Sequence, residues 1–386
     1  MISKLEDVGT TIFTIMSRRA RELDALNLGQ GFPDYDIDPR LTELVAAAMN
    51  AGHNQYAPME GLPVLRERIA GKLLGSYGLR VDPQDEVTVT LGATEAIYSA
   101  VQAVIGAGDE AIAFDPAYDS YEPAVRLAGG RCIRVPLAQP HFRYDWDRVR
   151  GALSARTRLV LFNSPHNPAC TTASAADLDE LARLIAGRDI LVLSDEVYEH
   201  VVFDGARHAS VLTHPGLAAR SLAVFSFGKT LHATGLRVGY CVAPAQLTRE
   251  LRKVHQFNTF SISHPLQHAI AAYLGEQPRC GEGLAAFFQA KRDRLRRALE
   301  PSGFVLPPAQ GTYFQLLDFA AFTPSDDRAF AERLLTEARV ATIPLSPFYA
   351  QPEPLSFVRL CIAKRDSTLD EAATRLNAFA ARAGRG

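Results

Sequence analysis

Short apolar runs alternate with helical patterns through the first part of the chain. The runs have the β-branched and aromatic composition of buried strands, and polar or small residues follow each of them. Between the runs, apolar residues recur every three or four positions, as on one face of a helix. Because strands and helices alternate, we expect an α/β domain with a mostly parallel sheet flanked by helices. The predicted strands are residues 87–91, 110–114, 158–162, 190–194 and 222–227.

The pattern changes near residue 276. A continuous helical region is predicted from Val254 to Leu274, and a further long helix carries Phe288, Leu295 and Leu299 on one face. Beyond this helix, strand-like and helical stretches are mixed at short intervals, which favours a smaller α+β domain. The predicted elements there are strands at 311–316, 341–345 and 357–362 and a helix around 330–335.

The length of the chain supports a division into two domains. At 386 residues it exceeds the size at which a single hydrophobic core usually stops growing. We expect residues 41–276 to form a large domain and residues 277–386 to form a small C-terminal domain. Residues 1–40 are expected to join the small domain.

Composition excludes several classes of function. The net charge of -2 gives no electrostatic footprint for nucleic acid or an anionic membrane. No run of about eighteen apolar residues occurs, and residues 1–7 lack the pattern of a secretory signal, so we expect a cytoplasmic protein. The five cysteines are scattered and lack CxxC spacing, which indicates neither a disulfide framework nor a zinc site. Small molecules or a second copy of the chain are the expected partners.

The segment around Lys229 carries the first chemical signal. Lys229 follows the predicted strand 222–227, and a lone lysine beyond a strand is usually solvated. Here, however, Ser226, Arg237 and several glycines lie in the same short segment. Glycines let a flat molecule approach the backbone, and an arginine binds phosphate through a bidentate fork. A lysine beside a phosphate site suggests a Schiff base with pyridoxal phosphate.

The same segment carries a family resemblance. Residues 226–240 read S-F-G-K-T-L-H-A-T-G-L-R-V-G-Y, which resembles the lysine segment of class I/II aminotransferases, where an arginine falls eight residues after the Schiff-base lysine. The local amino-acid sequence is most similar to that of bacterial methionine aminotransferases and of the kynurenine aminotransferase-like subgroup. The resemblance implies an aspartate-aminotransferase-like fold, that of the fold type I pyridoxal phosphate enzymes, with the cofactor bound by the large domain. Further motifs with this resemblance are N-L-G-Q-G-F-P-D-Y, N-Q-Y-A-P, L-G-A-T-E-A, F-D-P-A-Y-D-S-Y, N-S-P-H-N-P, S-D-E-V-Y-E-H, G-T-Y-F and V-R-L-C-I-A.

A glycine turn after the strand at 87–91 is a candidate phosphate site. Gly92, Ala93 and Thr94 join this strand to a helix, and the free N–H groups at a helix N-terminus favour an anion. Such turns are common in α/β proteins, so the turn alone is weak evidence. The resemblance implies that it holds the cofactor phosphate together with Ser226 and Arg237.

Four further side chains are implicated around the cofactor ring. On the residues alone, Tyr118 could be a core aromatic and Asp195 the N-cap of a helix. The resemblance implies that Tyr118 stacks on the ring, that Asn167 and Tyr198 hydrogen-bond its phenolic oxygen, and that Asp195 keeps the ring nitrogen protonated. The sequence departs from the family at residues 169–170, where Ala-Cys replaces the usual Thr or Ser followed by Gly.

The substrate is expected to contact two distant segments. The loop with Gly31, Phe32 and Tyr35 could be an ordinary surface turn, but the resemblance implies that it lines the substrate site. Arg359 interrupts an apolar strand, and a buried guanidinium needs either a fixed acid or a carboxylate ligand. The resemblance makes Arg359 the clamp for the substrate α-carboxylate, with Asn167 beside it.

Two aromatic residues suggest an assembly. Tyr56 and Phe260 would ordinarily be packing or interface residues. The resemblance implies that Tyr56 reaches the cofactor phosphate of a neighbouring subunit and that Phe260 enters the partner's substrate pocket. We therefore expect a homodimer with shared active sites.

The expected activity is transfer of an α-amino group to a 2-oxo acid through Lys229. No second arginine is evident beside the pocket segments, which argues against a dicarboxylate side chain, so methionine or an aromatic or neutral amino acid is the expected donor. The same ring chemistry could instead expel a β-thiolate, as in a carbon–sulfur β-lyase. A non-catalytic effector domain of a transcription regulator would require an added DNA-binding domain and a basic face, and the sequence has neither.

Overall fold

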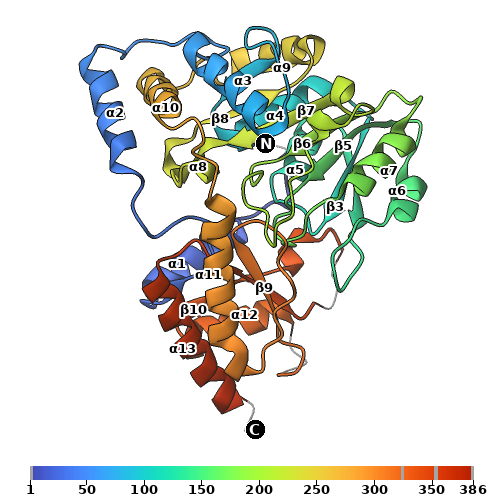
Figure 1. Cartoon of the computed structure of the whole chain (residues 1–386). Helices are drawn as coiled ribbons and strands as arrows, with labels where there is room; N and C mark the ends of the chain where they lie inside the picture. The colour runs from blue at the N-terminus through green and yellow to red at the C-terminus, as the bar shows by residue number, and fades with distance from the viewer. Residues whose placement is uncertain (1–2, 323–325, 352–354, 384–386) are drawn as a thin grey trace.

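The protein folds into two lobes joined by a long helix (Figure 1). The computed structural model describes residues 3–322, 326–351 and 355–383. None of the helices in these ranges is long and apolar enough to cross a membrane. The helices are α1 (Ile12–Glu22), α2 (Pro39–Asn50), α3 (Pro63–Tyr77), α4 (Gly92–Val104), α5 (Tyr121–Leu127), α6 (Trp146–Ala152), α7 (Ala175–Ile185), α8 (Phe227–Thr230), α9 (Ala245–Asn258), α10 (His264–Glu276), α11 (Leu284–Leu299), α12 (Asp327–Glu337) and α13 (Asp366–Ala383).

A seven-stranded sheet forms the centre of the larger lobe, with strand order β2-β8-β7-β6-β5-β3-β4. Strands β7, β6, β5, β3 and β4 run parallel, whereas β8 is antiparallel to both of its neighbours. This arrangement confirms the predicted α/β class with a mostly parallel sheet. The strands are β2 (Val87–Thr90), β3 (Glu110–Asp115), β4 (Arg131–Pro136), β5 (Thr157–Asn163), β6 (Leu191–Asp195), β7 (Ser221–Ser226) and β8 (Gly239–Val242).

Both faces of this sheet are buried. On β3, Ala111 and Ala113 face the cluster that includes α4, while Ile112 and Phe114 face the larger cluster on the other side. Because successive side chains of a strand point to opposite faces, a strand buried on both sides is apolar throughout. This is why the predicted strands read as continuous apolar runs.

The smaller lobe contains a three-stranded antiparallel sheet of order β11-β12-β9. Helix α11 runs from the larger lobe into this one and packs against α13 (Figure 1). The N-terminal segment also lies here, because β1 pairs in parallel with β10. The strands of this lobe are β1 (Leu26–Asn27), β9 (Phe314–Asp318), β10 (Val340–Ala341), β11 (Ile343–Pro344) and β12 (Phe357–Cys361). The exact domain boundaries stay a prediction.

Three predicted elements differ from the structure. The strand predicted at 341–345 is two short strands, β10 and β11, which belong to different sheets. The helical region predicted from Val254 to Leu274 is two helices, α9 and α10, separated by residues 259–263. Phe260 adopts a positive φ of 67° in this break, a backbone conformation that no helix contains, and Pro265 lies in the first turn of α10. The strand predicted at 311–316 begins only at Phe314.

Candidate active site

A cavity opens at the carboxyl ends of the parallel strands, where open α/β sheets bind their ligands. Side chains that follow β5, β6 and β7 meet there with the N-terminal turn of α4. Most of the predicted cofactor residues share this one cavity. Its lining consists of Ala93, Thr94, Ile97, Tyr118, Asn163, Asn167, Asp195, Val197, Tyr198, Ser226, Lys229 and Arg237.

Lys229 lies in α8, the single helical turn directly after β7. Its Nζ donates a hydrogen bond of 2.6 Å to the Tyr313 hydroxyl, which in turn donates one of 2.6 Å to the Gly31 carbonyl. This chain of bonds connects the large sheet, the start of β9 and the N-terminal loop. It fixes the direction of the lysine amine from the smaller lobe.

Burial lowers the pKa of the Lys229 amine to about 8. The positive charges of Arg237 and Arg359 act in the same direction, and the negative charge of Asp195 opposes them. A neutral amine is a nucleophile and a base, whereas an ammonium is neither. The Lys229 amine can therefore react at a pH well below the pKa of an ordinary lysine.

One end of the cavity is suited to an anion. The amides of Ala93 and Thr94 lie in the first turn of α4, which has no side-chain cap, and Ser226 and Arg237 face the same space. Gly92 has a φ of +71°, and a Cβ there would lie 2.8 Å from the Arg237 Nη2 atom. Only glycine lets the guanidinium approach the helix N-terminus this closely.

The cavity also presents a buried carboxylate, Asp195. Tyr121 donates a hydrogen bond of 2.6 Å to its Oδ2 atom, and no ion pair to Asp195 is found among the residues that the structure describes. Burial raises the pKa of Asp195 above its usual value. A buried acid with this environment is suited to a cationic or hydrogen-bond-donating ligand group.

The other predicted ring contacts surround the same space. Tyr118 is partly buried, with its ring edge-on to Tyr121 at 5.7 Å between centroids. Tyr198 is buried and lies edge-on to Tyr313 at 4.9 Å. Asn167 carries its side chain into the cavity and accepts a hydrogen bond from Arg359.

Arg359 is only 1% exposed, yet within the described residues it forms no ion pair with a carboxylate. Its Nη1 donates to Asn167 Oδ1 at 2.6 Å, and its Nη2 donates to the Gly29 carbonyl at 2.9 Å. Its Nε is buried without a partner, and the guanidinium lies 3.8 Å from the centre of the Phe314 ring. The alternative of a structural ion pair therefore does not account for this arginine.

The N-terminal loop reaches the same region. A Cβ at Gly31 would lie 2.6 Å from the Phe314 ring, so a glycine is required for this approach. Phe32 is 37% exposed, and the Lys364 Nζ donates to its carbonyl. Tyr35 lies edge-on to His232, with ring centroids 5.4 Å apart. His232 follows Lys229 by three residues in the sequence.

Tyr56 and Phe260 lie apart from this cavity. Tyr56 is 81% exposed and lies edge-on to Phe260 at 5.2 Å, and Phe260 is 48% exposed. Neither side chain lines the cavity of its own chain.

Sequence reasoning assigned no role to Tyr121 or Tyr313, which hold Asp195 and Lys229. Both belong to motifs that carried the resemblance, F-D-P-A-Y-D-S-Y and G-T-Y-F, and this was the available signal. Asn163 was also missed, although it lines the cavity and its Oδ1 accepts a hydrogen bond from the backbone N–H of Asn167.

Known proteins resemble this chain over its whole length. The family described as aminotransferase class I and II matches residues 24–376. A methionine aminotransferase of Escherichia coli (strain K12) is 51% identical over 374 residues, which cover 97% of each chain. Kynurenine–oxoglutarate transaminase 1 of Mus musculus is 32% identical over 410 residues, covering 97% of this chain and 96% of its own.

Solved structures agree with these relatives. An Escherichia coli structure for which a methionine aminotransferase function was identified has a TM-score of 0.96 and 50% identity, covering 98% of this chain and 99% of that one. N-succinyldiaminopimelate aminotransferase of Mycobacterium tuberculosis has a TM-score of 0.95 and 37% identity, covering 98% of this chain and 100% of that one.

The lowered pKa of Lys229 can be tested by chemical labelling of its amine. In protein free of bound cofactor, reductive methylation of Lys229 should rise with pH and reach half its maximal rate near pH 8, because only the neutral amine reacts. The other lysines of the chain serve as internal references, and an unperturbed lysine has a pKa of about 10.4. Peptide mass spectrometry measures each site separately. A half-maximal rate for Lys229 near the ordinary lysine value would contradict the prediction.

Proposed function

Because this chain belongs to the class I and II aminotransferases, we propose that Lys229 is the residue to which its cofactor attaches and that the surrounding cavity is the active site. As a member of this family, the protein is a pyridoxal phosphate-dependent aminotransferase that acts on amino acids and 2-oxo acids. The main support for this site is the convergence of an amine, an acid and a guanidinium. Lys229 and Asp195 line one cavity, and Arg359 bonds to Asn167 in the same lining.

The chemistry of the side chains fits pyridoxal phosphate. The anion-suited end, formed by Ala93, Thr94, Ser226 and Arg237, would hold the phosphate. Asp195 would hold the pyridine nitrogen in its protonated form, which supplies the positive partner that this buried carboxylate otherwise lacks.

The remaining ring contacts are proposed on the same basis. Tyr118 would stack on the ring, while Asn167 and Tyr198 would hydrogen-bond its phenolic oxygen. All three line the cavity.

Lys229 is proposed to be both attachment point and proton carrier. When bound, the cofactor supplies a conjugated ring that stabilises the electron pair left at the substrate Cα. The Lys229 amine, with a pKa of about 8, would accept the proton from this carbon and later donate it at the cofactor's aldehyde carbon. A base is most effective when its pKa is near the working pH, and burial brings that of Lys229 into this range. The Tyr313 hydroxyl keeps the amine oriented.

Arg359 is proposed to bind the substrate α-carboxylate. Its charge is permanent, and the fork of a guanidinium matches both oxygens of a carboxylate. Its present hydrogen-bond partners are neutral oxygens, so a carboxylate would provide the missing opposite charge. The stacked Phe314 ring limits how far the guanidinium can move.

The side-chain end of the substrate is proposed to lie against Gly31, Phe32 and Tyr35. Two ammonium groups are close by, but both are engaged. Lys364 donates to the Phe32 carbonyl, and Lys291 donates to Asp366 and to the Lys364 carbonyl. A pocket with aromatic walls, whose two neighbouring lysines are already hydrogen-bonded to protein oxygens, favours methionine or another neutral or aromatic donor over a dicarboxylate. The methionine aminotransferase that is 51% identical supports methionine.

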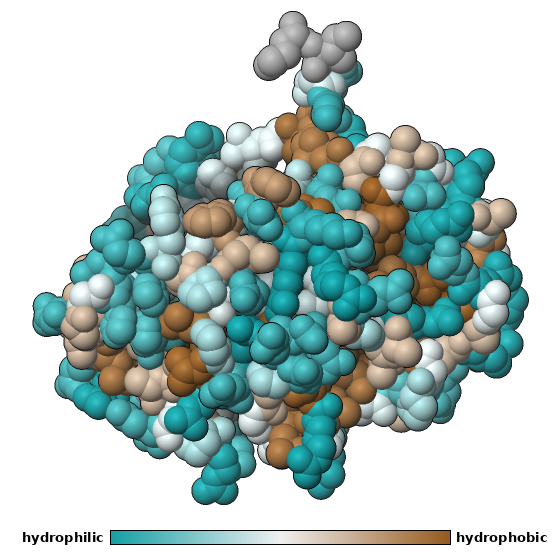
Figure 2. All heavy atoms as spheres, turned by 90° about the horizontal axis from the view of Figure 1, so that it is seen from above, coloured by the Kyte–Doolittle hydropathy of each residue, from teal (hydrophilic) through white to brown (hydrophobic). Residues whose placement is uncertain are grey.

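We also propose that two copies of the chain share their active sites. Figure 2 shows hydrophobic patches on an otherwise hydrophilic face of the larger lobe. Tyr56, Phe257 and Phe260 are among the exposed large hydrophobic residues, with exposed fractions of 81%, 86% and 48%. Exposed aromatics on adjoining segments are typical of interfaces. Tyr56 would reach the partner's phosphate site and Phe260 the partner's substrate pocket.

Replacing Lys229 tests the central assignment. Lys229→Ala should still bind pyridoxal phosphate, but turnover should fall at least by the roughly 10²–10⁴-fold typical of lost acid–base catalysis. After borohydride reduction, mass spectrometry should find the cofactor on the Lys229 peptide of the unaltered protein and on no peptide of the variant. Lys253→Ala, at an exposed lysine paired with Glu250, is the control. Retained transamination by Lys229→Ala would remove this residue from the chemistry.

The variant Arg359→Lys tests whether substrate binding needs only the positive charge of Arg359 or also the fork of its guanidinium. The variant keeps a positive charge but loses the fork, so one charge-assisted hydrogen bond of about 1.5–3 kcal/mol should be lost. We expect kcat/KM for amino acids to fall roughly 10- to 150-fold, mainly through KM, while cofactor affinity is unchanged. The exposed Arg297 on α11 provides the control Arg297→Lys. An equal loss of cofactor affinity would point to a structural role instead.

Profiling the amino donor tests the specificity. Methionine and the aromatic amino acids should convert the bound cofactor to its amino form faster than aspartate, with release of the matching 2-oxo acid. Aspartate exceeding them by a wide margin would overturn the proposal. Pyruvate and ammonia released from cystathionine without an oxo-acid acceptor would instead favour a β-lyase.

Mixing variants tests the shared sites. Lys229→Ala and Tyr56→Ala chains, refolded or co-expressed together, should recover about a quarter of the unaltered activity, because half of the dimers rebuild one intact site. The matched control is Lys229→Ala mixed with Arg237→Ala, since both residues are proposed to serve their own chain's site. Recovery in the control, or none in the test mixture, would contradict the arrangement.

A further inference from the structure

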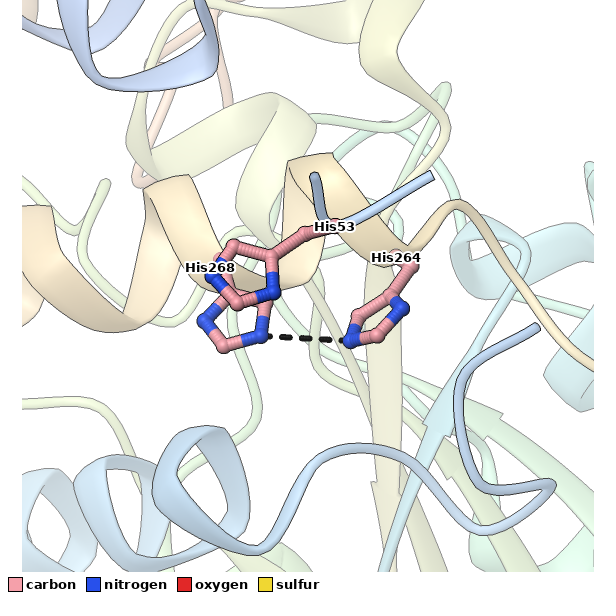
Figure 3. A group of neighbouring side chains, drawn as sticks. All are labelled: His53, His264 and His268. Carbon is pink, nitrogen blue, oxygen red and sulfur yellow. Dashed lines mark hydrogen bonds between the residues drawn. The ribbon is translucent and has the colours of Figure 1, made fainter. Parts of the chain in front are cut away.

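Three histidines gather away from the active site, at the start of α10. His264 and His268 lie one turn apart on α10, and His53 comes from the loop that follows α2 (Figure 3). One ring nitrogen of each lies within 4.8 Å of the others, and all three side chains are partly buried. None of them lines the cavity around Lys229.

The His264–His268 pair has the spacing of two metal ligands. Their Nε2 atoms are 3.2 Å apart. Two nitrogens bound tetrahedrally to zinc at about 2.0–2.1 Å would be separated by roughly 3.3 Å. The pair therefore has the separation of two ligands of one ion, which would take the place of the hydrogen bond between the two rings.

The outer hydrogen bond of His264 selects the required tautomer. Its Nδ1 lies 2.9 Å from the Gln55 carbonyl, which can only accept, so Nδ1 carries the hydrogen. In the neutral ring this leaves the Nε2 lone pair directed at His268. A carbonyl behind a histidine in this way is the usual support of a metal ligand.

His53 is positioned to complete the site after a ring rotation. Its ring stacks on His268 with centroids 3.6 Å apart and planes at 19°. A metal ion lies in the plane of the imidazole that binds it, so two rings stacked face to face cannot bind the same ion. Rotation of the His53 side chain, which belongs to a loop residue, would bring its nitrogen toward the pair.

We propose that His53, His264 and His268 form a binding site for a divalent transition metal ion of the zinc type. Three imidazoles and an open fourth position suit this class of ion, whereas magnesium and calcium require oxygen ligands. The expectation of no zinc site rested on cysteine spacing, which does not detect histidines so far apart in the sequence.

Binding would connect two segments near the proposed subunit contact. His53 precedes Tyr56 by three residues, and His264 follows Phe260 by four. The ion would hold the Tyr56 loop against α10. Its role would be structural, because it would fix the loop whose Tyr56 is proposed to reach the partner's phosphate site.

Zinc titration of the holoenzyme, produced without a histidine tag and treated with a chelator, tests the site by isothermal calorimetry. We expect one equivalent of zinc per chain and a rise in the melting temperature. His264→Ala and His268→Ala should each weaken binding at least as much as the roughly 10- to 100-fold typical of losing an outer-sphere partner. His53→Phe, which keeps a ring for stacking, should also weaken binding. His141→Ala, at an exposed histidine outside the cluster, should bind as the unaltered protein does.

Cobalt gives an independent readout that does not depend on the stability of the variants. Co²⁺ added to the unaltered holoenzyme should produce the intense visible absorption of a four-coordinate ion, and zinc should abolish it. Absence of this spectrum, or stoichiometric zinc binding that survives in both His264→Ala and His268→Ala, would overturn the proposal.

Discussion

Two cations, Lys229 and Arg359, lie at the proposed active site, and within the described chain neither has an ion-pair partner. Lys229 and Arg359 both lose hydration, and burial acts against the charge of each. The outcomes differ because the two groups differ. The amine yields its proton near neutral pH, whereas the guanidinium keeps its charge and remains ready for a carboxylate. One physical constraint, burial, thus underlies both the base and the anion receptor that we propose.

The surrounding fold holds these cations where they would otherwise be unfavourable. Lys229 is reached from the smaller lobe by Tyr313, and Arg359 is held by Asn167 from the larger one. Each lobe therefore orients a cation that the other lobe carries. A change in the position of the lobes would disturb both side chains together.

Much of this architecture could be predicted from the sequence because the relevant signals are local. A strand buried on both faces is apolar at every position, and a ligand at the carboxyl end of parallel strands must be met by the residue that follows. Lys229, Asp195 and the turn at Gly92 were found in this way, with the family resemblance assigning their roles. Tyr121 and Tyr313 were not assigned, because a tyrosine that orients a catalytic group has the same local pattern as one that fills a core.

The break between α9 and α10 shows a second limit of local patterns. The apolar spacing of Val254–Leu274 continues across residues 259–263, although the backbone there turns sharply at Phe260. The Phe260 N–H bonds back to the His255 carbonyl of α9, and the next residue contacts the Tyr56 loop through the bond from the Ser261 hydroxyl to the Ala57 carbonyl. The histidine cluster also depends on the contact between these two segments, and no local sequence pattern predicts that contact.

The pairing of β1 with β10 has a consequence for how the protein is made. Leu26 and Asn27 find their hydrogen-bonding partners in Val340 and Ala341, close to the other end of the chain. As the polypeptide leaves the ribosome, Leu26 and Asn27 must wait, unpaired, until Val340 and Ala341 have been translated. The smaller lobe, and with it the Gly29 and Gly31 carbonyls that meet Arg359 and Tyr313, can close only after that point in synthesis.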